Sequence, residues 1–168
     1  MDSNISQDEV KSFYDDFFES RMLDYRIHGN PRIDRAANRV LDFVNPDSRV
    51  LDIGCGIGIV CERVANRLES GHVWGVDISD KNIWYAKETI GHNNASFFTA
   101  DITSDSDKIR TTVETPLDVV SLIDVIEHIP KEEHPNLFRL LRTLTEDQAF
   151  VVLAYPSPQY QRHLMSEN

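Results

Sequence analysis

Cysteine, basic residues and long apolar runs are all scarce in this sequence. These scarcities argue in turn against disulfides, nucleic acid partners and membrane spans. Only two cysteines occur, Cys55 and Cys61, without a CxxC pair, so we expect free thiols in a reducing compartment. Lysine and arginine number 17 against 28 acidic residues, and the resulting net charge of −11 disfavours nucleic acid partners. No run approaches the ~18 apolar residues of a membrane span, and no leader pattern opens the chain. We therefore expect a cytoplasmic protein without a membrane partner.

Strand-like and helix-like segments alternate along the 168 residues, of which 40% are apolar. Short apolar runs predict buried strands at 49–53, 72–77, 95–101, 117–124 and 148–156. Helical spacing predicts helices at 57–70, 79–91, 105–114 and 131–144. We expect Ser79 to cap the second of these helices, Gly91 to end it, and Pro135 to limit the first turn of the last. The pattern predicts an α/β fold with a doubly wound parallel sheet of strand order 3-2-1-4-5.

Two further helices are predicted before the first strand. Apolar residues recur every three or four positions over 8–28, and "GNP" at 29–31 interrupts the pattern. A second helix is expected from Pro31 to about residue 45. This N-terminal helical extension divides the chain into a lid at 1–45 and a core at 46–168.

The string "VLDIGCGIG" at 50–58 places three glycines at alternate positions directly after the first strand. Ligands of doubly wound sheets bind at the carboxyl ends of the strands, where the strand order reverses, and this string lies there. The spacing differs from the dinucleotide fingerprint G-x-G-x-x-G, and no phosphate-binding GK[ST] follows. Asp52, two residues before the first glycine, could accept a hydrogen bond from an ammonium group.

These residues resemble motif I of the class I S-adenosylmethionine-dependent methyltransferases, and later landmarks follow in order. In "WGVDIS", Asp77 resembles the acid that holds both ribose hydroxyls of the cofactor, and Ile78 the residue that covers one face of its adenine. In "TADI", Asp101 and Ile102 resemble the partner of the adenine amino group and a second apolar cover. The segment 117–129 resembles the fourth-strand motif, whose end faces the methyl donor. The resemblance implies cofactor contacts from Asp52, Gly54, Cys55, Gly56, Gly58, Asp77, Ile78, Asp101, Ile102, Asp124 and Tyr14.

The resemblance covers roughly residues 45–156 and implies a Rossmann-like fold that uses S-adenosyl-L-methionine and releases S-adenosyl-L-homocysteine. Members of the family usually carry two more strands, strands 6 and 7, for which "SPQYQRHLMSEN" is too short. We therefore expect a C-terminally truncated piece. The fifth strand would then be an apolar sheet edge, so we expect either a monomer or a homodimer paired through that edge.

The segment "DVIEHIPKEEH" supplies the candidates for proton transfer: Asp124, Glu127, His128 and His134. We assign the catalytic roles to His128, as a base near neutral pH, and to Glu127. The spacing D-x-x-E-H also resembles the metal site of the small-RNA 3′-terminal 2′-O-methyltransferases, to which His163 could contribute. The aspartate in the first position and the acidic charge of the chain speak against that alternative, and no metal is assigned.

The N-terminal segment "FYDDFFESRMLDYRIHGNPR" supplies Tyr14, Tyr25, Arg26 and Arg32, which could close over the cofactor or hold an acceptor. We assign Tyr25 and Arg32 to acceptor binding. The likeness implies a bacterial methyltransferase that modifies a hydroxyl or amine of a small molecule in polysaccharide or secondary-metabolite pathways. A metal-assisted RNA 2′-O-methyltransferase and a non-catalytic cofactor-binding subunit stay open as alternatives.

Overall fold

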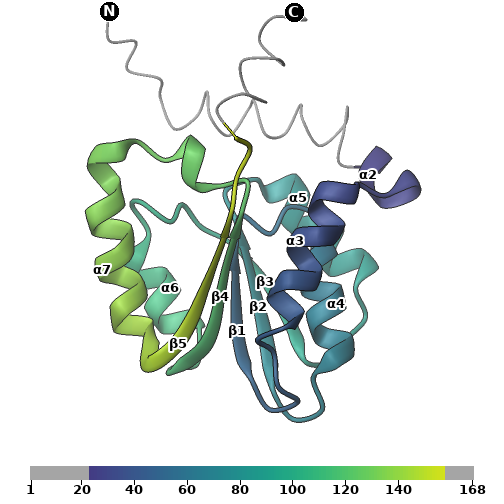
Figure 1. Ribbon diagram of the computed structural model, residues 1–168, viewed down its shortest axis with the longest axis horizontal. Coiled ribbons are helices and arrows are strands. Elements are labelled where there is room, and N and C mark those ends of the chain that lie inside the picture. Colours follow the sequence, from purple (N-terminus) through teal and green to yellow (C-terminus); the bar gives the residue numbers. More distant parts are fainter. Residues whose placement is uncertain (1–22, 158–168) are drawn as a thin grey trace, which may run out of the picture.

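A five-stranded parallel sheet forms the centre of the computed structural model, which describes residues 23–157 (Figure 1). The strands are β1 (Arg49–Ile53), β2 (His72–Asp77), β3 (Ala95–Thr99), β4 (Leu117–Ile123) and β5 (Thr145–Ala154). They lie in the order β3-β2-β1-β4-β5, and every neighbouring pair is parallel. The predicted fold class and strand order are confirmed, and the order reverses between β1 and β4.

Helices cover both faces of the sheet. One face carries α3 (Pro31–Leu41), α4 (Ile59–Arg67) and α5 (Asp80–Thr89), and the other carries α6 (Ser106–Thr112) and α7 (His134–Leu144) (Figure 1). Residues alternate between the two cores along each strand, so Val50 packs with α3 and α4 while Leu51 packs with α6 and α7. Short α2 (Leu23–His28) precedes α3, and two 3₁₀ turns, η2 (Ile126–His128) and η3 (Lys131–Glu133), follow β4.

The interruption predicted at 29–31 is confirmed. Gly29 adopts φ 76° directly after α2, and Asn30 caps α3 because its side-chain oxygen accepts from the backbone N–H groups of Arg32 and Ile33 at 3.0 and 3.3 Å. Pro31 then occupies the first turn of α3, where no N–H is needed. Residues 8–22 of the first predicted helix lie outside the described residues.

Several predicted boundaries are wrong. The helix α5 ends at Thr89 with Ile90 as its cap, so Gly91 does not end it, and Gly91 is absent from the glycines with positive φ. Ser79 does cap this helix, accepting from the N–H of Asn82 at 3.2 Å. Other helices are also shorter than predicted: α3 ends at Leu41 instead of near residue 45, α4 spans 59–67 instead of 57–70, and α6 spans 106–112 instead of 105–114. The helix α7 begins at His134 instead of 131, with Pro135 in its first turn.

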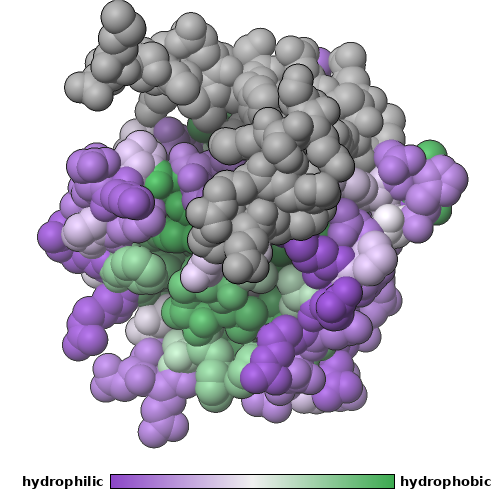
Figure 2. Space-filling view, turned by 45° about the horizontal axis from the view of Figure 1, so that its top comes forward, coloured by the Kyte–Doolittle hydropathy of each residue, from purple (hydrophilic) through white to green (hydrophobic). Residues whose placement is uncertain are grey.

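The outer edge of β5 carries exposed apolar side chains. Among the described residues β5 pairs with β4 alone; Phe150, Val151 and Leu153 are exposed along it, and Tyr155 is exposed just after its end. Figure 2 shows an apolar patch on this side of the molecule. No helix of the described residues is long and apolar enough to cross a membrane.

Candidate active site

The glycine loop between β1 and α4 is fixed to the end of β2. The backbone N–H groups of Gly54 and Cys55 both donate to the Val76 carbonyl, at 2.8 and 3.0 Å. Gly54 has φ 68°, and a Cβ atom built there would lie 2.2 Å from Cγ2 of Val125. Gly54 is also exposed, whereas the other loop residues are buried. The loop therefore offers bare backbone to a ligand at the carboxyl edge of the sheet.

Asp77 ends β2 and holds the loop from the other side. Its Oδ2 accepts from the Gly56 N–H at 2.8 Å, and its Oδ1 accepts from the Ser79 N–H at 2.9 Å and from Nδ2 of Asn82 at 3.2 Å. The residue is only 8% exposed. Asn82, which the sequence interpretation missed, lies in the first turn of α5 and keeps a buried Oδ1 without a hydrogen-bond partner in the structure. The sequence signal for Asn82 was a polar residue on the buried face of an amphipathic helix.

Asp52 lies beneath the loop, with 2% of its surface exposed. Its Oδ1 accepts from the Ser121 hydroxyl at 2.6 Å, and the Cys61 thiol donates to Oδ2 at 3.5 Å. Burial raises the pKa of Asp52 to about 6, although the Ser121 and Cys61 hydrogen bonds lower it in part. The carboxylate thus joins β1, β4 and α4. Ser121 was missed, although a lone serine inside the apolar run "LDVVSLI" signalled a buried polar contact.

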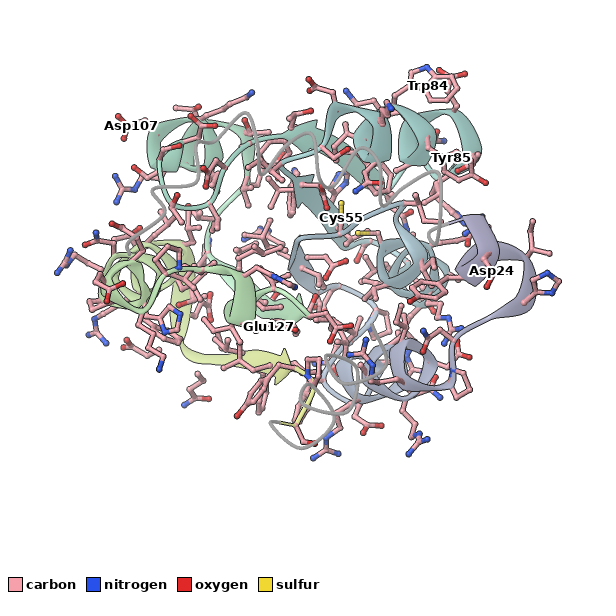
Figure 3. The ribbon with its side chains drawn as sticks, turned by 90° about the horizontal axis from the view of Figure 1, so that it is seen from above. Asp24, Cys55, Trp84, Tyr85, Asp107 and Glu127 are labelled. Carbon is pink, nitrogen blue, oxygen red and sulfur yellow. The ribbon has the colours of Figure 1, made fainter. Side chains whose placement is uncertain are left out.

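Both cysteines are free thiols, as the sequence predicts, and both are buried. Burial raises the pKa of Cys55 to about 11 and the pKa of Cys61 well above its usual range. Such thiols carry almost no thiolate at neutral pH, so neither is an activated nucleophile. Seen from the carboxyl ends of the strands, Cys55 lies near the middle of the molecule, while Asp24, Trp84 and Asp107 lie at the rim (Figure 3).

The residues assigned to adenine lie side by side at the ends of β2 and β3. The Ala100 N–H donates to the Asp77 carbonyl at 3.0 Å, which brings Ile78 beside Asp101 and Ile102. All three side chains are partly buried. The Asp101 Oδ1 accepts from the N–H and hydroxyl of Thr103, at 2.8 and 2.7 Å, so the turn after β3 orients this carboxylate.

The end of β4 carries an unusual backbone conformation. Asp124 has φ 57°, the single positive φ outside glycine among the described residues, and its N–H donates to the Ala154 carbonyl at 2.7 Å. Its Oδ1 forms an ion pair with Arg32 at the start of α3. Residues other than glycine adopt positive φ uncommonly, aspartate more readily than most, and such conformations cluster at functional sites. The pair links the N-terminal helices to the strand end that was assigned to the methyl donor.

Glu127 and His128 lie in η2, directly beyond this strand end. Glu127 is partly buried, its Oε2 is buried without a hydrogen-bond partner in the structure, and burial raises the pKa of the carboxyl group. It lies beside η2 in the view onto the carboxyl-end face (Figure 3). His128 is exposed. His134 contributes a ring nitrogen 3.0 Å from the Ile129 carbonyl, which ties it to the turn.

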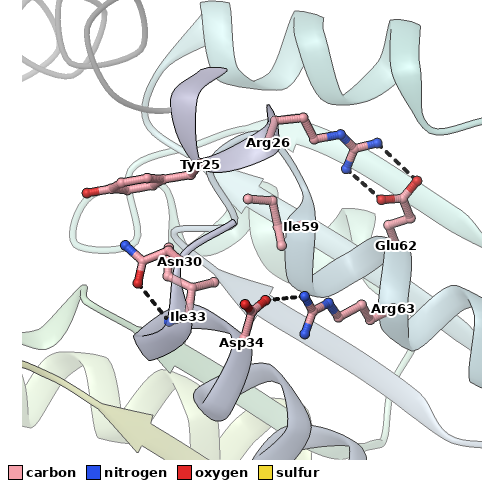
Figure 4. Close-up of a pocket in the computed structure, with 8 residues that line it drawn as sticks. All are labelled: Tyr25, Arg26, Asn30, Ile33, Asp34, Ile59, Glu62 and Arg63. Carbon is pink, nitrogen blue, oxygen red and sulfur yellow. Dashed lines mark hydrogen bonds and ion pairs between the residues drawn. The ribbon is translucent and has the colours of Figure 1, made fainter. Parts of the chain in front are cut away.

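A pocket of about 210 Å³ separates the N-terminal helices from α4 (Figure 4). Tyr25, Ile33 and Ile59 line it. Two ion pairs cross it in opposite directions: Arg26 donates to both carboxylate oxygens of Glu62, at 2.5 and 3.0 Å, and Arg63 pairs with Asp34. Of the residues assigned to the acceptor, Tyr25 therefore lies in this pocket and Arg32 at the end of β4.

Two of the sequence candidates, Tyr14 and His163, lie outside the described residues. Within 23–157 no three histidine, cysteine or acidic side chains lie close enough to hold a metal ion. The D-x-x-E-H spacing of Asp124, Glu127 and His128 accordingly forms no three-residue ligand group here, since Asp124 pairs with Arg32.

Comparisons with known proteins agree with this geometry. The sequence profile of a methyltransferase domain family matches residues 25–168. A ubiquinone biosynthesis O-methyltransferase of Hahella chejuensis is 32% identical in an alignment 139 positions long, which covers 76% of this chain and 52% of that protein. The chain spans about half the length, or less, of the curated relatives that it matches first.

Solved structures show the same fold. The DhpI-SAM-HEP complex superposes with a TM-score of 0.69 at 19% identity, over 100% of this chain and 74% of that one. Magnesium protoporphyrin IX methyltransferase from Synechocystis with bound SAH superposes with a TM-score of 0.63 at 22% identity, over 94% of this chain and 77% of that one.

Proposed function

Because the chain belongs to the S-adenosylmethionine-dependent methyltransferases, we propose that it transfers a methyl group to a hydroxyl or amine of a small-molecule acceptor. The observation that carries this proposal is the glycine loop, which hydrogen bonds to Val76 and Asp77 hold at the place where the strand order of the sheet reverses. S-adenosylmethionine, when bound, supplies a methyl group on a positively charged sulfur.

The residues at the end of β2 fit the ribose of this cofactor. Asp77 offers carboxylate oxygens beside the glycine loop, where it accepts from the Gly56 N–H, and Asn82 offers a buried Oδ1 without a partner. A ribose hydroxyl donating to that atom would satisfy a group whose burial is otherwise unfavourable. We place the adenine between Ile78 and Ile102, with Asp101 at its edge.

We assign proton transfer to Glu127, with His128 as its outlet to solvent. Methyl transfer to a hydroxyl group requires the acceptor to lose a proton as the new bond forms, and a protonated amine must lose a proton before its nitrogen can attack. The Oε2 of Glu127 has no hydrogen-bond partner in the structure, and burial raises the pKa of this carboxyl, so it is a stronger base than an exposed glutamate. His128, exposed next to it, can pass the proton on to water.

The acceptor would bind between the N-terminal helices and the strand ends. Tyr25 supplies an aromatic wall in the pocket beside α4, and Arg32 supplies a cation at the end of β4. The name of the Hahella chejuensis relative, a ubiquinone biosynthesis O-methyltransferase, supports a hydroxyl on a small organic molecule as the methylated group.

Two alternatives are less well supported. A metal-assisted reaction on RNA would need Asp124 as a metal ligand, but this carboxylate pairs with Arg32. A subunit that binds the cofactor without catalysis would not need the buried, unpaired Oε2 of Glu127.

Calorimetric titration with S-adenosylhomocysteine tests the cofactor site. We expect binding that neither Mg²⁺ nor a chelator changes, and we expect Asp77→Ala to weaken it by about 10- to 100-fold, because a charged partner of hydroxyls is worth ~1.5–3 kcal/mol. Asp47→Asn, an exposed aspartate before β1, is the matched control. A 2′-deoxy ligand should lose less affinity on the Asp77→Ala variant than on the parent, since the two changes remove one interaction. If the 2′-deoxy ligand lost as much affinity on the variant as on the parent, the assignment of Asp77 to the ribose would be wrong.

Methyl transfer to a panel of small phenols, alcohols and amines tests the reaction. Glu127→Gln should lower turnover by about 100-fold or more while leaving the affinity for S-adenosylhomocysteine unchanged. Unchanged turnover in this variant would remove Glu127 from the mechanism. Turnover that appears only with RNA and a divalent metal would favour the first alternative, and binding without any turnover the second.

A further inference from the structure

Asp124 takes part in contacts that its assignment to the cofactor does not explain. Its Oδ1 accepts from Nη1 of Arg32, in an ion pair that joins the end of β4 to the start of α3. Both side chains are partly buried. The negative charge of Asp124 is therefore matched by a cation of this same chain, and its contribution to the site has to be sought in what the pair does to its neighbours.

The backbone of Asp124 leads the chain from β4 to the glycine loop. The residue has φ 57°, and its N–H stays bonded to the Ala154 carbonyl at 2.7 Å. The next residue, Val125, packs against the loop so closely that a Cβ atom built at Gly54 would lie 2.2 Å from its Cγ2. The 3₁₀ turn η2 follows directly, so the turn at Asp124 places Glu127 beside the cofactor loop.

Glu127 lies within electrostatic reach of both members of the pair. Burial raises the pKa of its carboxyl group, and among the smaller effects His128 and Arg32 lower this pKa while Asp124 raises it. The Oε2 of Glu127 is buried without a hydrogen-bond partner in the structure. The guanidinium of Arg32 thus has two carboxylates within reach, and it pairs with Asp124.

Pairing of Arg32 with Glu127 instead would be unfavourable for proton transfer. An arginine next to a carboxylate lowers its pKa by about 1–3, and arginine–carboxylate pairs are often bidentate, so that both oxygens are occupied. In that state Glu127 would be a weaker base and would have no oxygen free for the acceptor. The carboxylate of Asp124 competes for the same guanidinium from the end of β4.

We propose that Asp124 is a positioning residue that holds Arg32 away from Glu127 and thereby keeps the Glu127 carboxylate available to the acceptor. This inference rests on the proposed function, in which Glu127 is the base. It accounts together for the positive φ of Asp124, its ion pair and the unpaired Oε2 of Glu127. The bond to Asp124 uses Nη1 of Arg32, and the guanidinium has further N–H donors with which it can contact an acceptor.

Turnover of a small set of variants tests the proposal. Asp124→Asn keeps the shape of the side chain and a residue that tolerates positive φ, but it removes the charge that binds Arg32. Its kcat at saturating acceptor should fall by about 10-fold or more, because Arg32 then pairs with Glu127. Adding Arg32→Gln to this variant should restore kcat to within about threefold of the parent, since the competing cation is gone. A change in KM alone would report only the contact of Arg32 with the acceptor.

Asp42→Asn is the matched control, because it breaks an exposed ion pair with Arg39 at the end of the same helix, α3. This variant should turn over like the parent. A double variant as slow as Asp124→Asn would overturn the proposal, because removing Arg32 would not repair a merely structural defect. Parental kcat in Asp124→Asn, with weaker binding of S-adenosylhomocysteine, would overturn it too and return Asp124 to the cofactor site.

Failure of this inference and failure of the proposed base give different results. If Glu127→Gln turns over like the parent, the assignment of the base is wrong, and the inference is wrong with it. If Glu127→Gln is slow while Asp124→Asn is not, only the inference is wrong. If Asp124→Asn does not fold, Arg32→Gln alone decides: it should keep kcat within about threefold of the parent, and a loss as large as that of Glu127→Gln refutes the proposal.

A measurement without turnover tests the same competition. Carbon-13 NMR titration of the Glu127 carboxyl, assigned with Glu127→Gln, should show a pKa lower by about 1 or more in Asp124→Asn than in the parent. In the double variant with Arg32→Gln, the pKa should return towards the parental value. A pKa of Glu127 that stays within a few tenths of the parental one in Asp124→Asn would mean that Arg32 does not engage Glu127, and would refute the proposal.

Discussion

At the scale of single residues, the glycine loop shows most directly how local stereochemistry shapes the site. Gly54 and Gly58 have φ 68° and 81°, a region that other residues enter at a cost. Their missing side chains also leave room for Val125 and Ile90, which a Cβ atom would approach to 2.2 and 2.4 Å. The three-glycine pattern therefore reflects packing as well as ligand approach.

Gly54→Ala should lower the free energy of unfolding by about 1–3 kcal/mol, because it adds left-handed strain and a clash with Val125. Gly91→Ala is the matched control, since a Cβ there meets nothing within 4 Å and the φ of Gly91 is not positive. Urea denaturation measures both variants. The control should be neutral or slightly stabilising, and an equally small effect at Gly54 would contradict the packing argument.

Asp52 predicts a pH dependence of stability. Its pKa is about 6 in the folded protein against 3.8 for an ordinary aspartate, so the folded protein binds more protons between these values. Stability from this group is therefore highest at low pH and decreases as pH rises from about 4 to 6, by about 3 kcal/mol in total. Asp52→Asn, which keeps an oxygen for Ser121, should remove this loss.

The measurement is urea denaturation of the parent and the Asp52→Asn variant at a series of pH values. The parent-minus-variant difference in unfolding free energy should fall across this window and stay level above it. Asp47→Asn, at an exposed site, should leave the parent's pH profile unchanged. A parent-minus-variant difference that rises with pH would mean that the folded protein favours the carboxylate form.

At the scale of elements, α3 depends on one cap for its placement. The Asn30 side chain accepts from two N–H groups at the start of the helix that carries Arg32 and Asp34. Asn30→Ala should destabilise the protein by about 1 kcal/mol, whereas Asn38→Ala, exposed in the same helix, should have little effect or stabilise. Thermal unfolding of both variants checks this, and equal melting temperatures would argue against the cap.

The sequence predicts the order and type of these elements better than their ends. Alternation of apolar runs with helical spacing was sufficient for the strand order, because parallel crossovers leave few arrangements. Predicted helix ends were wrong where the cap was misassigned: α5 ends at Thr89, its cap Ile90 has extended backbone, and Gly91 is not used. For β5, the strand begins at Thr145, directly after α7, instead of at 148.

The candidate site was predictable only in part, for a related reason. Motif residues such as Asp77 could be proposed from the family resemblance, because they end a strand and follow the glycine loop closely in sequence. The hydrogen bond of Asp52 to Ser121 spans 69 residues, and the ion pair of Arg32 with Asp124 spans 92. Contacts of this kind depend on which strands become neighbours and on side-chain rotamers, neither of which a local pattern contains.

At the scale of the whole molecule, the acidic balance leads to a prediction about RNA as an acceptor. With a net charge of −11, the chain should not bind a small RNA duplex with measurable affinity at physiological salt. Fluorescence anisotropy of a labelled duplex checks this, with a basic RNA-binding protein as the positive control. Micromolar or tighter binding that weakens steeply with salt would reopen the RNA alternative.

The cytoplasmic location and the division of the chain into a lid and a core at residue 45 stay predictions. Ala37 and Val40 of α3, which belong to the predicted lid, pack in the same core as β1.

The strand order also has a consequence for how the chain is made. Strands β1, β2 and β3 are consecutive in sequence and adjacent in the sheet, so the half that carries the glycine loop and its anchor Val76 can pair before β4 and β5 have left the ribosome. Until β4 arrives, Asp52 has no Ser121 hydroxyl beside it and keeps its hydration instead. During translation, the burial of that carboxylate thus marks the moment when the second half of the sheet joins the first.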